Sequence, residues 1–418
     1  MLLSHKTTIQ LNSRYSNIIG HMCHAASKLW NVCNYERHHY KEQELTQYPD
    51  WYYQKKYHKN NMWYKSLPSQ TAQEVCKVLD KSWKSFYALQ KSKGIENPQP
   101  PRFKHEGIAI TYMQKGIVHE AGSAVVRLSL PKQLKGYMSE SYDIHDDYLF
   151  LENELFRNMD IIKQIKIYPP TKGECRIIVV YEVPDIKELP DNGKYLSIDL
   201  GVHNFLTCLN SETGESFIVG RKYLSICHYY NKEIGRVQSR WYSIQNAKGV
   251  RYPKSSAHIE RLYRQKNDAV LDYLHKITRY IVSYCKENDI HTVIVGDITG
   301  IRKNKDYGNI TNQKLHALPY KKIFILLEYK LALEGIRFVK RMEAYSSQCS
   351  PFSPVVSKQY AVKKNRIKRG LYKDNGYAWN ADCAGAYNIL RLYLSDIKKP
   401  VPLSPLEIKA PYIAKVAA

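Results

Sequence analysis

Asp199 is the first of several acidic residues whose positions suggest chemistry. It lies near the end of the apolar segment Tyr195–Leu200 and is followed by Gly201. A carboxylate in a buried strand is unfavourable unless a partner or a metal ion neutralises it. At the edge of a sheet such a carboxylate could hold Mg²⁺, which prefers oxygen ligands. The alternative is a strand-end aspartate that only caps the following turn.

Three further acids occupy similar positions. Asp297 and Glu343 each come just after a strand-like segment, and Asp382 lies in the first turn of a helix expected over 380–394. Small residues at 381 and 384–386 would let that helix pack close to a sheet. We therefore expect several acids to converge on one sheet edge.

Phosphodiester hydrolysis is a reaction that needs such a cluster. Water must be activated, and the leaving oxyanion must be stabilised. Two Mg²⁺ ions about 3.5–4 Å apart do both. Two or three carboxylates would hold such a pair without acting as nucleophiles themselves.

Composition favours a nucleic-acid partner over a membrane. Lys and Arg total 63 against 39 Asp and Glu, which gives a formal net charge of +24. Such a charge repels itself unless a polyanion neutralises it, although a merely soluble basic protein is the alternative. No apolar run is long enough for a membrane span or a secretion signal, so a cytoplasmic protein is expected. The nine cysteines form no CxxC pair, which argues against a disulfide framework and a zinc site.

The first half combines helical and strand-like patterns. Apolar spacing predicts helices within 16–96, and the prolines of 97–101 end them. The basic, aromatic segment 51–59 fits either a base-stacking surface or core packing. A strand is expected at 7–11, and more follow the prolines, as in a small antiparallel barrel with a helical insert. These later strands are expected at 108–113, 124–130, 148–151, 162–168 and 175–183.

The second half alternates strands and helices. A linker at 188–193 precedes strands expected at 195–200, 205–209, 216–219, 292–295 and 336–341. Helices are expected at 258–287, 315–334 and 380–394. This order predicts a mixed α/β fold in which helices cover a sheet.

At these motifs the sequence resembles TnpB, a transposon-encoded family related to type V CRISPR effectors. The resemblance covers 190–395 most strongly, and its motifs are 197–202, 274–277, 294–302, 343–348 and 380–389, with a weaker one at 101–104. It implies an RNase H-like RuvC nuclease domain after an N-terminal, wedge-like β-barrel with a helical recognition insert. It also implies a guide RNA that pairs with the target strand of a double-stranded DNA, a short DNA motif read by the protein, and cleavage of both strands.

Gly296 departs from the family pattern, because relatives commonly carry a glutamate there. Either Asp297 takes over the role, or Glu343 supplies the acid from the neighbouring strand. We favour Glu343, because its arm is longer than that of aspartate. The expected catalytic residues and metal ligands are therefore Asp199, Glu343 and Asp382, with Asp297 in reserve. Two Mg²⁺ ions, or Mn²⁺ in their place, would be the cofactor.

The second departure is the missing zinc ribbon. Many relatives carry two CxxC pairs where this chain has the segment 345–379 with a basic run at 363–369. We expect no zinc, but a basic loop or hairpin that contacts nucleic-acid backbone; a solvated charge run is the alternative. The residues expected to bind nucleic acid, here and elsewhere, are Arg102, Lys104, Arg261, Arg264, Arg302, Lys303, Lys363, Lys364, Arg366, Lys368 and Arg369.

The sequence therefore predicts an RNA-guided, Mg²⁺-dependent DNA endonuclease of a prokaryotic cytoplasm, acting at the nucleoid. The expected domains are a wedge-like barrel at 1–15 and 97–188, a helical insert at 16–96, a RuvC-like domain at 189–395 and a tail at 396–418. Two alternatives remain. Gly296 would suit a catalytically inactive, RNA-guided DNA-binding repressor. A conventional transposase is disfavoured by the motif order and by the lack of a helix-turn-helix reader.

Overall fold

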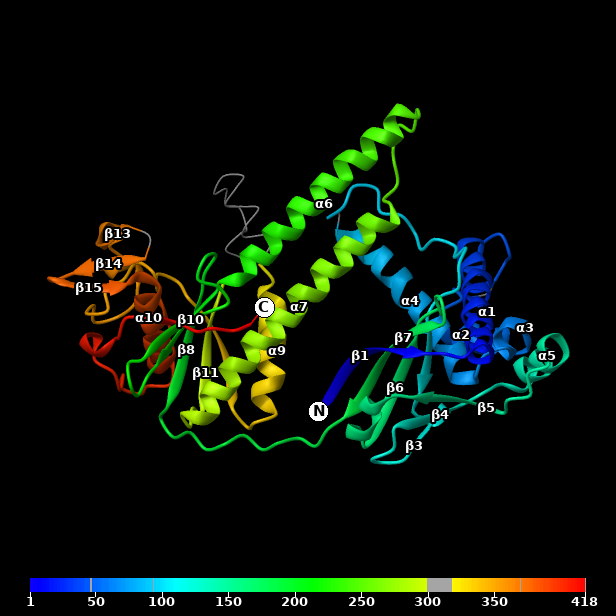
Figure 1. The fold of residues 1–418 in the computed structure, drawn as a ribbon, viewed down its shortest axis with the longest axis horizontal. Coiled ribbons are helices and arrows are strands. Elements are labelled where there is room, and N and C mark those ends of the chain that lie inside the picture. The colour runs from blue at the N-terminus through cyan, green and yellow to red at the C-terminus, as the bar shows by residue number, and fades with distance from the viewer. Residues whose placement is uncertain (46, 93, 299–317, 369, 418) are drawn as a thin grey trace. The chain divides into compact units, whose positions relative to one another are not determined.

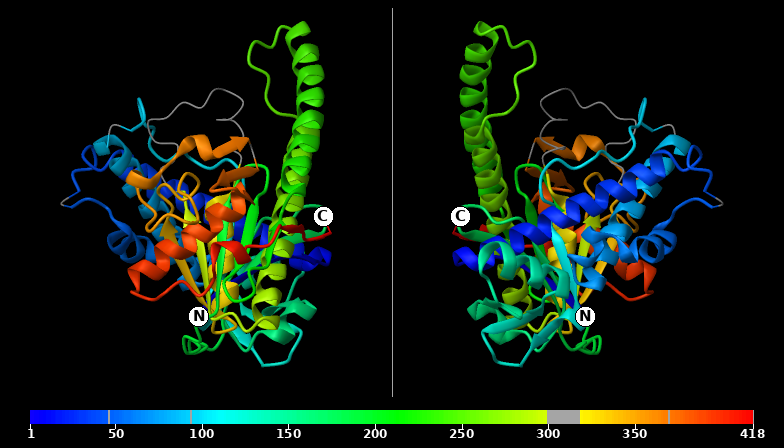
Figure 2. Two further views of the ribbon diagram at one scale, coloured as in Figure 1. Left: turned by 90° about the vertical axis from the view of Figure 1, so that its left-hand side faces the viewer. Right: turned by 90° about the vertical axis from the view of Figure 1, so that its right-hand side faces the viewer.

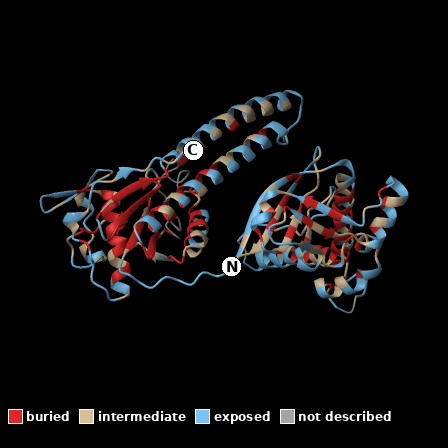
Figure 3. Ribbon diagram, turned by 60° about the horizontal axis from the view of Figure 1, so that its bottom comes forward, coloured by how far each residue is buried: buried red, intermediate tan, exposed pale blue. Residues whose placement is uncertain are grey.

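The structure is a computed structural model of the 418-residue chain, and it describes residues 1–45, 47–92, 94–298, 318–368 and 370–417. The chain divides into two compact units, Met1–Asp185 and Ile186–Ala418. Figure 1 labels their elements, and Figure 3 shows buried residues concentrated inside each unit. No helix in the described part of the chain is long and apolar enough to cross a membrane.

The first unit contains two antiparallel sheets. Its four-stranded sheet has the order β1-β7-β6-β2, and its three-stranded sheet has the order β3-β4-β5. The strands are β1 (Leu2–Gln10), β2 (Ile110–Met113), β3 (Ile117–His119), β4 (Val125–Ser129), β5 (Tyr148–Glu152), β6 (Ile161–Ile167) and β7 (Glu174–Glu182).

The expected closed barrel is not confirmed in the described residues, although the strands lie close to their predicted positions. The short 3₁₀ turn Gln114–Gly116 separates β2 from β3. The ladder to β6 therefore ends at Met113, and the chain pairs next with β4 in a different sheet. Sequence patterns locate strands, but they do not reveal this change of partner.

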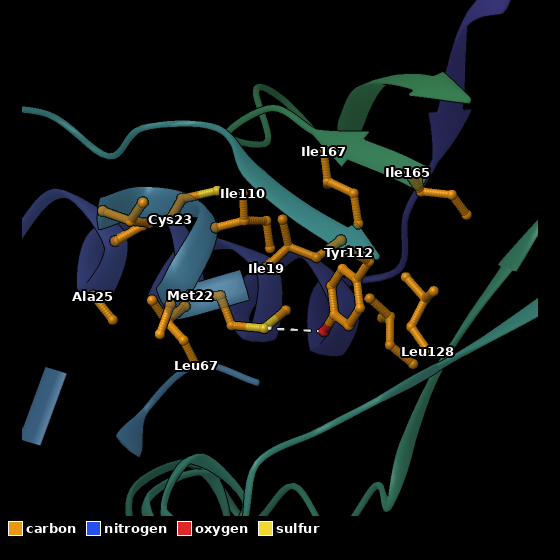
Figure 4. Close-up of a cluster of buried hydrophobic side chains, with 14 of the residues drawn as sticks. Ile19, Met22, Cys23, Ala25, Leu67, Ile110, Tyr112, Leu128, Ile165 and Ile167 are labelled. Atoms are coloured by element: carbon orange, nitrogen blue, oxygen red, sulfur yellow. Dashed lines mark hydrogen bonds between the residues drawn. The ribbon is translucent and has the colours of Figure 1, made fainter. Parts of the chain in front are cut away.

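Helices of the first unit lie between β1 and β2 in the sequence, apart from α5. They are α1 (Ser13–His38), α2 (Trp51–Tyr57), α3 (Met62–Lys65), α4 (Ser69–Ser92) and α5 (Lys132–Tyr142). Their apolar faces share one core with the sheets. Figure 4 shows Met22 of α1 packed against Tyr112 of β2, whose hydroxyl donates to the Met22 sulfur at 3.3 Å.

A buried polar cluster joins α1, α2 and α4. Arg37 is 2% exposed; its Nη1 donates to Asp80 at 3.0 Å and its Nε donates to Gln54 at 3.0 Å. Gln54 donates in turn to Glu36 at 2.8 Å, and His58 lies 3.2 Å from the same carboxylate. Each acid in this cluster therefore has a polar or cationic partner.

The second unit is built on a six-stranded sheet with the order β12-β11-β8-β9-β10-β16. Central strand β8 (Tyr195–Leu200) pairs in parallel with β11 (Thr292–Asp297), which pairs in parallel with β12 (Arg337–Met342). Parallel pairing places the carboxyl ends of these three strands at one edge of the sheet. The remaining strands are β9 (Leu206–Asn210), β10 (Ser216–Val219) and β16 (Tyr412–Ile413).

Helices cover both faces of this sheet. One face packs against α7 (Ala257–Glu287) and α9 (Tyr320–Ala332), and the other packs against α10 (Ala381–Asp396). Helix α6 (Lys222–Ala247) pairs with α7, and two views show this pair extending well beyond the sheet (Figures 1 and 2). The mixed α/β fold expected from the sequence is confirmed.

Two further segments complete the second unit. The basic insertion forms a small antiparallel sheet of β13 (Arg366–Lys368), β14 (Leu371–Asp374) and β15 (Tyr377–Asn380). The segment expected as a tail returns to the main sheet, because β16 pairs in parallel with β10.

Candidate active site

A cavity of about 540 Å³ opens at the edge of the sheet where β8 ends. Its lining includes all three acids expected as catalytic residues, together with neighbouring polar and cationic side chains. The polar and charged residues of the lining include Asp199, Asn204, Arg221, Glu343, Arg366 and Asp382.

Asp199 is held between strand β8 and helix α10. It is half-buried and lies one residue before the end of the strand. A Cβ atom on Gly385 of α10 would lie 2.8 Å from Oδ2 of Asp199. The absent side chain at Gly385 therefore makes room for the carboxylate.

Glu343 occupies the space over Gly296. Val295 of β11 pairs with Ile198 of β8, so Gly296 lies alongside Asp199, one residue further on. A Cβ atom on Gly296 would collide with Oε2 of Glu343. That oxygen is buried and has no hydrogen-bond partner. Glycine at 296 and glutamate at 343 are therefore sterically complementary.

Asp382 lies in the first turn of α10. Asn380 caps the helix by accepting hydrogen bonds from the backbone N–H groups of Asp382 and Cys383. Asn204 donates to Oδ2 of Asp382 at 2.8 Å, and Arg366 contacts Oδ1 at 3.4 Å. Both carboxylate oxygens are thus engaged by neighbouring side chains.

Asp297 is not part of the cavity lining. Side chains alternate along a strand, so Asp297 is directed to the face of β11 opposite to Gly296. Its negative charge still contributes to raising the pKa of Glu343. The structure therefore brings Asp199, Glu343 and Asp382 to one cavity and leaves the reserve candidate beside it.

The electrostatics of the cluster are unbalanced. Burial raises the pKa of Asp199 to about 7; the Asp382 charge adds to this rise and the Arg366 charge opposes it. Burial raises the pKa of Glu343 to about 9, with added repulsion from Asp199 and Asp297. A nearby divalent cation would favour the charged forms of both acids.

The donor chemistry of the cavity suits a divalent cation such as Mg²⁺. Carboxylate oxygens are its preferred ligands, and Oε2 of Glu343 is a buried acceptor without a partner. Within the described ranges, no group of three His, Cys, Asp or Glu side chains is arranged to hold an ion. Both carboxylate oxygens of Asp382 bond to protein side chains, Asn204 and Arg366.

The other expected nucleic-acid-binding residues lie on several elements. Asn31 of α1 anchors the backbone of Lys104, whose ammonium lies 4.8 Å from the Trp30 ring centroid. The remaining described side chains, Arg102, Arg261, Arg264, Lys363, Lys364 and Lys368, are exposed. Arg302, Lys303 and Arg369 lie outside the described residues.

Asn204 and Arg221 are among the cavity residues that reasoning from the sequence missed. Asn204 lies in the turn between β8 and β9, and Arg221 immediately precedes α6. Neither has a spacing signal, because both reach the cavity from connecting segments. Helix α6 was also missed, although its three buried residues, Tyr223, Cys227 and Ile234, follow a helical spacing in the sequence.

Family comparisons match two segments of the chain. Residues 178–302 match the OrfB_IS605 family, described as "Probable transposase", and residues 320–389 match the Cas12f1-like TNB domain. The chain is 21% identical to the TnpB-like protein ORF457 of Acidianus two-tailed virus over 409 residues, covering 90% of this chain and 84% of the relative.

Solved structures share the fold at low sequence identity. The Cas12f1 chain from a complex with sgRNA and target DNA is 13% identical, with a TM-score of 0.52 over 93% of this chain and 98% of that chain. The mini-RNA-guided endonuclease CRISPR-Cas_phi3 is 11% identical, with a TM-score of 0.53 over 96% and 93%. The chain thus combines an OrfB_IS605 segment and a Cas12f1-like TNB segment on a type V effector-like fold, which confirms its resemblance to TnpB.

Proposed function

We propose that this chain is an RNA-guided DNA endonuclease with a RuvC-like catalytic site in its second unit. The observation that carries the proposal is the convergence of Asp199, Glu343 and Asp382 on one cavity. The TnpB-like segments and the shared fold of the RNA-guided relatives support it.

Asp199, Glu343 and Asp382 would hold two Mg²⁺ ions, or Mn²⁺ in their place. These ions would supply an activated water and a counter-charge for the leaving oxygen. Gly296 and Gly385 keep space for the Glu343 and Asp199 carboxylates. Asn204 holds the carboxylate of Asp382, and the Asn380 cap holds its backbone N–H. We assign Asp297 no ligand role, because it lies outside the cavity lining.

The partners follow from the relatives and from the charge of the chain. A guide RNA would select double-stranded DNA by base pairing, and the protein would read a short motif beside the target. We propose that α1–α4 form the recognition insert at 16–96 and that both N-terminal sheets form the wedge-like part. The second unit would be the nuclease domain. A site of action on DNA in a prokaryotic cytoplasm fits this activity.

The exposed cations would follow nucleic-acid backbone. We assign this role to the side chains already described at the 101–104 segment, on α7 and in the basic insertion. These contacts would be independent of sequence and weakened by salt. Arg302, Lys303 and Arg369 keep the same assignment from the sequence alone.

Cleavage by the protein, purified with its copurifying RNA, tests the proposal. A plasmid carrying the sequence that matches that RNA is incubated with Mg²⁺ and wild type, Asp199→Ala, Glu343→Ala or Asp297→Ala. We expect wild type to cut, the first two variants to lose at least about a thousand-fold in rate, and Asp297→Ala to keep cutting. Guided binding by wild type without any cleavage would replace the nuclease with the repressor alternative.

A further inference from the structure

The Asp382 carboxylate is already shared between two side chains. Arg366 contacts Oδ1 at 3.4 Å, and Asn204 donates to Oδ2 at 2.8 Å. Arg366 is the charged member of this arrangement and lines the cavity beside Asp199. A cation that binds Asp382 through Oδ1 must therefore displace or share the guanidinium contact.

The strand that carries Arg366 is built irregularly. Strand β13 pairs with β14 through Arg366↔Tyr372 and Lys368↔Leu371, with a register shift between these pairs. Bulges of this kind bend a strand and redirect a side chain. Ile367 and Lys368 are exposed, whereas the Arg366 side chain is 36% exposed and reaches the cavity. The register shift therefore occurs where Arg366 lines the cavity while the next two residues of β13 stay exposed to solvent.

A guanidinium at this position has two suitable anionic partners. It can pair with the Asp382 carboxylate, as here, or with a phosphate of a DNA strand that enters the cavity. The two pairings compete for the same donor. A phosphate that captures Arg366 would release Asp382 for a metal ion.

We propose that Arg366 is a positioning residue that couples metal loading to the arrival of a DNA strand. Without DNA, its contact with Asp382 weakens metal binding at the site. With DNA, the phosphate takes the guanidinium and the acids become free to bind the ion. This inference rests on the proposed function and adds a regulation to the same site.

Linkage makes the coupling measurable without cleavage. If DNA strengthens metal binding by a given factor, the metal must strengthen DNA binding by the same factor. Removing Arg366 should tighten metal binding without DNA, because a competing cation is lost. It should also reduce the effect of DNA on metal affinity.

The test is Mn²⁺ binding to the full-length protein, followed by electron paramagnetic resonance of free Mn²⁺. Titrations are made with and without a short phosphorothioate-linked single strand, and Mn²⁺ bound by the strand alone is subtracted. The variants are Arg366→Ala, Arg366→Lys and Asp199→Asn, with Lys373→Ala on β14 as the matched control. Lys373 is exposed, belongs to the same small sheet and does not line the cavity.

We expect the strand to tighten Mn²⁺ binding to wild type by about five-fold or more, within the usual range of coupling. Arg366→Ala should bind Mn²⁺ more tightly without DNA and lose most of that coupling. Arg366→Lys should retain part of it, and Lys373→Ala should match wild type. The inference is overturned if Mn²⁺ binding depends on Asp199 while Arg366→Ala leaves both affinity and coupling unchanged. Mn²⁺ binding that is unchanged in Asp199→Asn would instead contradict the proposed metal site itself.

Discussion

Each unit buries a cluster of charged side chains, and the two clusters differ in how their charges are balanced. In the first unit, Asp80 pairs with Arg37 at 3.0 Å and with Lys84 at 2.8 Å. Although burial acts to raise it, the hydrogen bonds from Lys84 and Arg37 hold the pKa of Asp80 below its ordinary value. In the second unit, burial and like charges raise the pKa values of Asp199 and Glu343.

This difference separates a structural cluster from a candidate functional one. Oppositely charged partners within the fold neutralise the buried acid Asp80. The acids around Asp199 have Arg366 as their cavity partner on β13, and Glu343 retains an oxygen without any partner. Perturbed acids in a cavity are typical of functional sites, because a bound ion can supply the missing charge.

The first prediction concerns moving the glutamate from position 343 to position 296, where relatives commonly carry one. In Glu343→Ala, an added Gly296→Glu should restore cleavage from at least about a thousand-fold loss to near the wild-type rate. The reason is that the two positions share one space, so a carboxylate from either could fill it. The measurement is plasmid cleavage by the RNA-bound protein.

The matched control for this exchange is Gly296→Glu alone. Two glutamates would then compete for one space, so cleavage and thermal stability should both fall. Failure of the double variant to cut, while it folds and binds its target, would show that the positions are not interchangeable.

The second prediction concerns removal of Arg37 from the charge-balanced cluster of the first unit. Arg37→Ala should lower the free energy of unfolding of the first unit by about 3–5 kcal/mol, because Asp80 loses its buried partner. Denaturant unfolding of the full chain measures the loss. Lys84→Ala is the control: its side chain is 73% exposed, so solvent screens its pairing with Asp80 and the cost should be much smaller than that of Arg37→Ala. Equal costs for both substitutions would contradict this account.

The third prediction concerns removal of the Glu343 charge from the unbalanced cluster of acids. The raised pKa of Glu343 means that its neutral form is favoured in the folded protein. The contribution of Glu343 to the free energy of unfolding is therefore most favourable below the ordinary carboxyl pKa. This contribution is lost as the pH rises toward about 9, because the unfolded chain ionises Glu343 more readily than the folded protein does. Glu343→Gln should therefore raise the melting temperature in a metal chelator by about 2–4 °C or more at pH 8.

The same substitution should have little effect near pH 5, where Glu343 is already neutral, and excess Mg²⁺ should reduce or reverse the difference at pH 8. Melting curves across this pH range, with and without the chelator, measure both effects. A constant difference between wild type and Glu343→Gln at every pH would rule out charge as its cause.

Part of the site could be predicted from where acidic residues lie relative to the expected strands and the last helix, together with the family resemblance. Asp199, Glu343 and Asp382 were expected because acids followed apolar segments or opened a helix, and all three line the cavity. Asp297 had the same sequence signal, but strand alternation directs it to the other face. Asn204 had no signal, because its place depends on the turn between two strands.

Some elements of the fold could likewise be predicted from the sequence, and others could not. Long periodic segments were located well: the helix expected at 258–287 is observed at Ala257–Glu287. Helix α6 was missed although its apolar and aromatic residues repeat at three- and four-residue spacing, so the signal was present in the sequence. The residues of this repeat are Tyr223, Cys227, Tyr230, Ile234, Val237, Trp241 and Ile244. The closed barrel was not confirmed, because sheet membership depends on pairing between distant segments and periodicity reports only single strands.

The space left by Gly385 has a genetic consequence. A glycine codon becomes an alanine codon by a single base change, and the added methyl group would press on the Asp199 carboxylate at 2.8 Å. Such a change alters no charged residue and leaves every motif acid in place. A lineage could therefore lose cleavage while keeping guided binding, and a search for missing acids would overlook it.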